Sequence, residues 1–233
     1  MNAPASSARR RTVVAVMRKD LRIERNSRIL LNQVAPFAAI VMVLFAFALD
    51  NEGILQRVAP GLVWLAVLFS MLVVIQRSFA VESADGALDA LRVAGVDPAA
   101  IFIGKSAALF VQLLALEVLL VLTAVVLYGV TLTTAGVALV ACTLVLATVG
   151  LSCVGTLYGG LATGARGRET LLPLLVLPVV APVLIGATRA SEAAFGSGGA
   201  EVAEGWAWLA LLGVFAIVFA TVGSIAFGPL VDE

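Results

Sequence analysis

The sequence predicts an all-α fold, a polytopic bundle of six membrane-spanning helices. Of the 233 residues, 61% are hydrophobic and only 13% are charged. A soluble domain carries about a quarter charged residues. The mean hydropathy is +1.09, and apolar runs recur at the length of about 20 residues that a bilayer-crossing helix needs. A water-soluble core of this size could not hide so much apolar surface, so soluble enzymes are excluded and no nucleic-acid partner is expected.

The chain begins with a basic segment, residues 1–28, which we expect to be a cytoplasmic tail. Within it, Val13–Arg28 places Val14, Met17 and Leu21 on one helical face and basic residues elsewhere. This pattern is typical of an amphipathic helix that lies on the lipid surface. The alternative is a basic, partly frayed tail. Residues 29–233 are then the membrane domain.

Six apolar runs mark the expected spans. The fifth contains Pro173, Pro178 and Pro182, so we expect it to be kinked and surrounded by protein that satisfies the freed carbonyl groups. Only Thr131–Thr134 separates the third run from the fourth, which predicts a tight antiparallel hairpin. The expected spans are Leu30–Leu49, Val58–Ile75, Ala107–Val130, Ala135–Leu161, Leu171–Ala187 and Trp206–Val231.

The basic residues predict the orientation of these spans. Thirteen of the 15 Lys and Arg residues lie before the first span or in the second and fourth connections, and only Arg57 and Arg189 lie in segments on the other side. Cytoplasmic loops are enriched in Lys and Arg, so both termini are predicted to be cytoplasmic. A secretory signal is the alternative for the first span, because Ala46-Phe47-Ala48 resembles a cleavage site. The basic region before the first span is too long, and the apolar run too extended, for a typical secretory signal peptide.

The longest polar interruption is Gln76–Lys105, which we call the coupling segment. We expect a short amphipathic helix with Glu82, Asp85 and Asp89 on its polar face, then a turn at Gly95. Asp97-Pro98 predicts the start of the next helix, with Asp as the N-cap and Pro in the first turn. The segment could bind a soluble partner. Alternatively, it is a solvated loop helix whose charges keep it out of the bilayer.

Gly104-Lys105-Ser106 resembles the end of a phosphate-binding loop, but the first glycine of that motif is replaced by Ala99. We expect Lys105 to extend towards the membrane interface instead. The chain has no histidine and no cluster of acidic residues or cysteines at ligand spacing, so neither a catalytic site nor a metal site is predicted.

Further polar and small residues lie within the spans. Glu117, near the middle of the third span, is a candidate gate or pathway residue, or a partner in a hydrogen bond between helices. Tryptophans near span ends, Trp64 among them, are expected in an aromatic belt at the interface. Small-xxx-small spacing predicts close helix packing in the fourth span, at Gly155, Gly159, Gly160 and Gly164.

Taken in order, several pieces of the chain are similar to the haem exporter protein B family, the membrane subunit of the cytochrome c maturation ABC transporter. The loop pattern Glu82-x-x-x-Gly86 also resembles the cytoplasmic loop of type-2 ABC permeases. The resemblance runs from Arg18 to Glu192. Its pieces are Arg18-Lys19-Asp20-Leu21-Arg22, Phe45-Ala46-Phe47, Ala59-Pro60-Gly61-Leu62-Val63-Trp64-Leu65, Arg77-Ser78-Phe79, Asp85-Gly86-Ala87-Leu88 and Leu171-Leu172-Pro173-Leu174-Leu175-Val176-Leu177-Pro178.

The resemblance implies a multi-pass protein of the bacterial inner membrane, in contact with lipid, with a separate ABC ATPase in the cytoplasm. ATP and Mg²⁺ would bind to that ATPase, and haem would be handled or transported rather than held as a cofactor. Further implied partners are a haem-handling membrane subunit, a periplasmic haem chaperone and a second permease copy. The driven step would be haem export or release of the haem-loaded chaperone. The residues implied in ATPase coupling are Glu82, Asp85, Gly86, Leu88, Asp89 and Leu91.

Two alternatives stay open. One is a type-2 permease that exports a drug, a lipid or a polysaccharide. The other is a secondary transporter without an ATPase, which ranks lower because such proteins often contain inverted repeats and several polar residues at the membrane midplane. We find no repeat in the sequence, and Glu117 is the one central carboxylate.

Overall fold

A computed structural model describes residues 5–49, 51–85, 95–161 and 168–231, and within these ranges all regular secondary structure is helical, as predicted. The elements are α1 (Ala5–Ser27), the π-helix η1 (Leu30–Val34), α2 (Ala35–Ala48), α3 (Glu52–Asp85), α5 (Pro98–Tyr128), α6 (Thr134–Leu161), α7 (Arg168–Phe195), the 3-10 helix η3 (Ser197–Gly199) and α8 (Val202–Val231).

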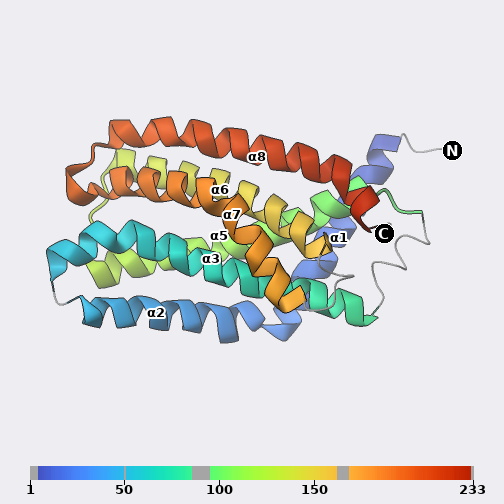
Figure 1. The fold of residues 1–233 in the computed structure, drawn as a ribbon, viewed down its shortest axis with the longest axis horizontal. Helices are drawn as coiled ribbons and strands as arrows, with labels where there is room; N and C mark the ends of the chain where they lie inside the picture. The colour runs from blue at the N-terminus through green and yellow to red at the C-terminus, as the bar shows by residue number, and fades with distance from the viewer. Residues whose placement is uncertain (1–4, 50, 86–94, 162–167, 232–233) are drawn as a thin grey trace.

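Five of these helices, and η1 continued by α2 over Leu30–Ala48, are long and apolar enough to cross a membrane, which confirms the six expected spans. They form a bundle in which the start of α1 and the end of α8 lie at the same end (Figure 1). We call this the termini end. The end of α3 and the start of α5 lie there too, so the bundle gathers there the segments that contain most of the basic residues.

The helix α3 is longer than the predicted span. It continues from Glu52 through the first part of the coupling segment to Asp85, where we expected a separate short helix. The reason is that no glycine or proline follows Gly61 until Gly86, so nothing in the sequence breaks the helix. The predicted restart is confirmed, because Gly95 has a φ of +68° and Asp97 Oδ1 accepts a hydrogen bond of 3.1 Å from the Ala99 amide at the start of α5.

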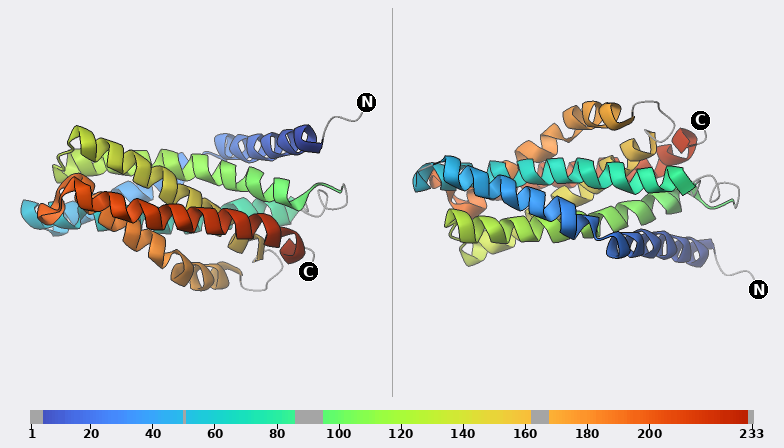
Figure 2. Two further views of the ribbon diagram at one scale, coloured as in Figure 1. Left: turned by 90° about the horizontal axis from the view of Figure 1, so that it is seen from above. Right: turned by 90° about the horizontal axis from the view of Figure 1, so that it is seen from below.

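The helix α7 includes all three prolines of the predicted fifth span and continues to Phe195. Its first turns bend away from the rest of the helix, as expected for a proline-rich segment (Figures 1 and 2). The extra turns at its end hold Arg189 and Glu192, whose Nη1 and Oε2 atoms are 2.8 Å apart.

The packing is uneven around the bundle. The inner faces of α3, α5 and α6 supply much of the core, whereas α2 and α8 expose large apolar side chains such as Phe47 and Ile225. One prediction is wrong here. Trp64 is not at the lipid interface but only 1% exposed, and its Nε1 donates a 2.9 Å hydrogen bond to Ser191 Oγ on α7. The cause is its position on the face of α3 that packs against α7.

Candidate functional site

The predicted coupling segment is described only in part. Gly86, Leu88, Asp89 and Leu91 lie outside the described residues. Glu82 and Asp85 belong to the last turns of α3, where the structure describes the backbone alone. The first turns of α5, one flank of the segment, pack against α1 at the termini end (Figure 2), and Val74, Arg77 and Ser78 of α3 lie across a cleft from the last turns of α1. This junction is the candidate functional site.

At its centre is a buried lysine that sequence analysis misplaced. Lys105 does not extend to the interface. It is 3% exposed, and its Nζ lies 3.3 Å from Oδ2 of Asp20, itself only 8% exposed. The same ammonium group lies 4.5 Å from the ring centroid of Phe79 on α3. The prediction failed because α1 covers this part of α5 and supplies a countercharge.

The helix α1 confirms the predicted N-terminal helix, but its packed face differs from the expected one. Val16 and Asp20 are buried, whereas Val14 and Leu21 are half-buried. A Cβ added to Gly104 would lie 2.8 Å from the Val16 Cβ and 2.9 Å from the Val13 carbonyl oxygen. Glycine at position 104 therefore permits α1 to contact the α5 backbone closely.

The charges of α1 are segregated between its two sides. Asp20 and Glu24, the acidic residues of the helix, occupy the side that packs on the bundle and are buried or half-buried. All six arginines of the helix are exposed, namely Arg9, which pairs with Asp97, and Arg10, Arg11, Arg18, Arg22 and Arg25. This segregation is the sequence signal that could have identified Asp20, because its helical position is opposite to the arginine face.

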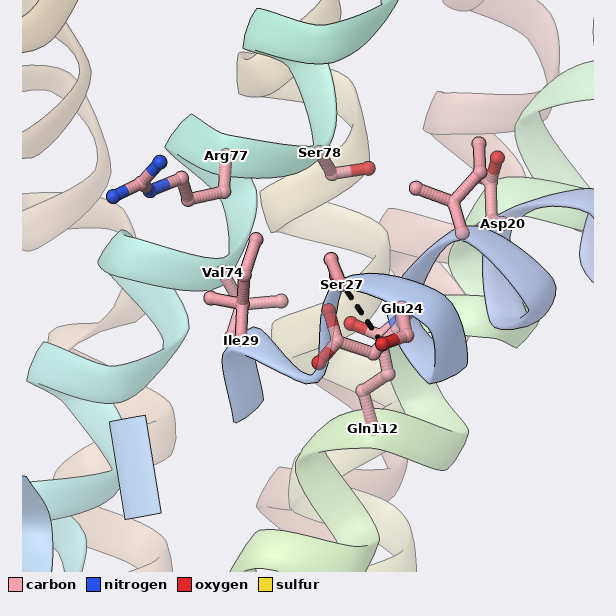
Figure 3. A pocket seen from close by; sticks show the side chains of 9 residues that line it. Asp20, Glu24, Ser27, Ile29, Val74, Arg77, Ser78 and Gln112 are labelled. Atoms are coloured by element: carbon pink, nitrogen blue, oxygen red, sulfur yellow. Dashed lines mark hydrogen bonds between the residues drawn. The ribbon is translucent and has the colours of Figure 1, made fainter. Parts of the chain in front are cut away.

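A small cleft lies beside the ion pair (Figure 3). It is lined by Asp20, Ile23, Glu24, Ser27, Ile29, Val74, Arg77, Ser78 and Gln112, with a volume of about 50 Å³. The Arg77 guanidinium points away from the other labelled side chains and donates to Gln33 Oε1 at 3.3 Å. Sites for small molecules and cofactors occupy about 300–1,000 Å³. The cleft can therefore hold water but not a haem.

Glu117 lies in the middle of α5 and is fully buried. Thr148 Oγ1 on α6 donates to Glu117 Oε2 at 2.5 Å, and the same hydroxyl also contacts the Leu144 carbonyl oxygen. Among the described residues, Glu117 Oε1 has no hydrogen-bond partner. The contact joins two spanning helices inside the core of the bundle, where both side chains are fully buried.

Three of the glycines singled out in the fourth span, Gly155, Gly159 and Gly160, are buried on α6. A Cβ on Gly159 would lie 2.4 Å from the Phe79 ring, and one on Gly155 would lie 2.5 Å from Ile75 Cδ1, both on α3. A Cβ on Gly160 would lie 2.8 Å from the Phe227 ring of α8. Gly164 lies outside the described residues. Glycines of this row let α3 and α8 contact α6 on two sides.

Comparison with known proteins gives one family. A family model described as "CcmB protein" matches residues 11–232. The chain is 31% identical over 219 residues to the "Heme exporter protein B" of Paracoccus denitrificans, covering 92% of this chain and 94% of that protein. It is 32% identical over 208 residues to the protein of the same name from Pseudomonas aeruginosa, covering 84% and 90%, and 34% identical over 151 residues to that from Rhodobacter capsulatus, covering 64% and 68%.

Proposed function

The chain belongs to the CcmB protein family, and from this premise we propose that it is the membrane permease subunit of an ABC transporter in cytochrome c maturation. In this proposal a separate cytoplasmic ATPase drives either haem export or release of a haem-loaded periplasmic chaperone. The observation that carries the proposal is the family match over residues 11–232, together with relatives named heme exporter protein B that match most of the chain.

The fold supports a permease that takes its energy from a partner. Gly104-Lys105-Ser106 lies inside the helix α5, so its backbone amides are used in the helix and cannot wrap a phosphate. We therefore assign ATP and Mg²⁺ to the ATPase subunit. Haem is proposed as cargo or as a ligand of a partner, and the cleft at the junction, with a volume of about 50 Å³, is too small to hold it.

The coupling segment is suited to transmit force because it joins two spanning helices directly. The helix α3 extends unbroken from the opposite end of the bundle into the segment, and α5 leaves the segment at Pro98 and crosses back. An ATPase that pushes on Glu82, Asp85, Gly86, Leu88, Asp89 and Leu91 would tilt both helices together. We propose that both termini are cytoplasmic, which puts the segment on the side where ATP is available.

Affinity purification in mild detergent tests this proposal. The parent chain should retain an ABC ATPase and a haem-handling membrane subunit, both identified by mass spectrometry. Asp85→Arg and Leu88→Arg should each release the ATPase or abolish its coupling to cytochrome c assembly. The matched control is Arg57→Ala, because Arg57 is exposed on the part of α3 at the opposite end of the bundle.

Two results would contradict the proposal. One is an ATPase that stays bound to the Asp85 and Leu88 variants with unchanged cytochrome c assembly. The other is a parent chain that purifies with an ATPase and a lipid or polysaccharide-processing partner instead of a haem-handling one, which would favour a type-2 permease for another substrate.

A further inference from the structure

We infer that α1 moves together with the coupling segment when the ATPase acts on it, and that the buried ion pair between Asp20 and Lys105 positions α1 against α5. This inference rests on the proposed function and deepens it. Asp20 and Lys105 are proposed as positioning residues, which transmit movement between helices without touching the cargo or the nucleotide.

Three contacts tie α1 to the first turns of α5. Arg9 Nε lies 3.2 Å from Oδ2 of Asp97, the N-cap of α5. Gly104 leaves α1 in direct contact with the α5 backbone at Val16. Lys105 Nζ lies 3.3 Å from Asp20 Oδ2. The contacts begin at the residue where the coupling segment becomes helical, so these turns of α5 cannot tilt without moving α1.

Lys105 also reaches the other flank of the coupling segment. Its ammonium lies 4.5 Å from the ring centroid of Phe79, which α3 holds six residues before Asp85. The Phe79 ring in turn packs on Gly159 of α6, where a Cβ would lie 2.4 Å from the ring. One buried cation therefore links α1 with both helices that enter the coupling segment.

Packing alone does not account for this arrangement. A buried ion pair is often no more stabilising than apolar residues of the same volume, because both charges lose their hydration. Its best-attested advantage is that it fixes one register between two elements, since a shifted register would leave a charge unpaired. Asp20 and Lys105 would thus fix the axial position of α1 against α5 while the ATPase moves the segment.

The test compares variants in the complete complex and measures cytochrome c assembled per ATP hydrolysed, normalised to folded permease. The double variant D20N/K105M removes both charges, so neither partner is left as an unpaired buried ion. It should retain the ATPase subunit and a melting temperature close to the parent's. Its coupling ratio should fall about tenfold, which lies within the range for changes along a coupling path.

The charge-swapped variant D20K/K105D should recover most of the lost coupling, because opposite charges again specify one register. The matched control is R189A/E192A, which removes an exposed ion pair of α7 at the other end of the bundle and should leave the ratio unchanged. Arg9→Ala removes a half-exposed pair, so the variant will fold, and its coupling ratio should fall about twofold.

Several outcomes would overturn the inference. One is parental coupling in D20N/K105M. Another is a folded D20K/K105D that is as poor as the neutral variant. Should neither double variant accumulate, parental coupling in Arg9→Ala would overturn the inference by itself. If the parent chain retains no ATPase, the proposed function fails and the inference fails with it, and this result is distinct from the others.

Discussion

The helix α5 buries two ionisable side chains in two different ways. Lys105 near the termini end has a carboxylate as its partner, supplied by a helix that does not span the bundle. Glu117 lies about 18 Å further along the helix axis, and its partner among the described residues is the Thr148 hydroxyl of a neighbouring span. The difference indicates that an ion pair holds the peripheral helix α1 against the bundle, whereas a hydrogen bond to a hydroxyl group joins two spans that already face each other along their lengths.

The two contacts should also differ in how much stability is lost when one partner is replaced. The Asp20–Lys105 pair contains two opposite charges, so replacing Asp20 removes a carboxylate from beside a buried ammonium group, whereas replacing Lys105 leaves Asp20 with Lys19. The Glu117 contact contains one carboxyl group and a hydroxyl that also contacts the Leu144 carbonyl oxygen, so its partner keeps a second contact when the carboxyl is changed. We therefore expect substitutions at the two places to differ in size, and the predictions below rank them.

The largest effect is expected for Asp20→Asn. The substitution removes the carboxylate that pairs with Lys105, whose side chain is 3% exposed. Removing one member of a buried pair lowers the free energy of unfolding by about 3 kcal/mol or more. Lys105→Met should cost less, because Asp20 keeps Lys19 at 3.1 Å. Denaturant unfolding in detergent checks both values. Equal and small losses for the two variants would show that the pair is hydrated, against the contrast drawn above.

The next effect is expected for Gly104→Leu, which tests the contact between α1 and α5 without changing any charge. The added side chain meets Val16 and the Val13 carbonyl, and overpacking of this kind costs about 1–3 kcal/mol. Hydrogen exchange should rise in α1 while the six spans stay protected. The control is Gly213→Leu on α8, where a Cβ has no neighbour within 4 Å. Exchange that rises equally throughout the bundle would contradict a local role.

The spans could be predicted from sequence because each is a long apolar run with recognisable end signals. The N-cap Asp97 and Pro98 fixed the start of α5, as the sequence indicated. The ends of α3 and α7 could not be located from hydropathy, since polar residues can continue a helix beyond the apolar run. Apolar composition indicates which residues cross the lipid bilayer, whereas glycine and proline indicate where a helix ends.

The candidate site was harder to predict because its contacts join distant parts of the chain. Asp20 and Lys105 are 85 residues apart, and Trp64 and Ser191 are 127 apart. Local patterns contain no direct information on such pairs, so a lysine at a span end and a tryptophan near one were both assigned to the interface. Only the separation of acidic and basic residues on α1 indicated that one of its faces is covered.

A small effect is expected for Glu117→Gln. Glutamine keeps an acceptor oxygen and adds an NH₂ donor, so both contacts of Thr148 can still be made. The loss of stability should stay within about 1 kcal/mol. Cytochrome c assembly should remain near the parental level. The measurement is haem staining of c-type cytochromes at matched expression. A complete loss of assembly with normal protein levels would assign Glu117 to a transport pathway and not to packing.

The smallest effect is expected for Arg189→Ala. This variant tests whether burial or the distance between the charges sets the energy of an ion pair. The Arg189–Glu192 pair is shorter than the Asp20–Lys105 pair, at 2.8 Å, but the arginine side chain is 59% exposed. Exposed pairs of this kind contribute about 0.3–0.5 kcal/mol, because water already solvates both charges. Unfolding in detergent with and without added salt measures the difference. A loss as large as that of Asp20→Asn would mean that distance, not burial, sets the energy of an ion pair in this protein.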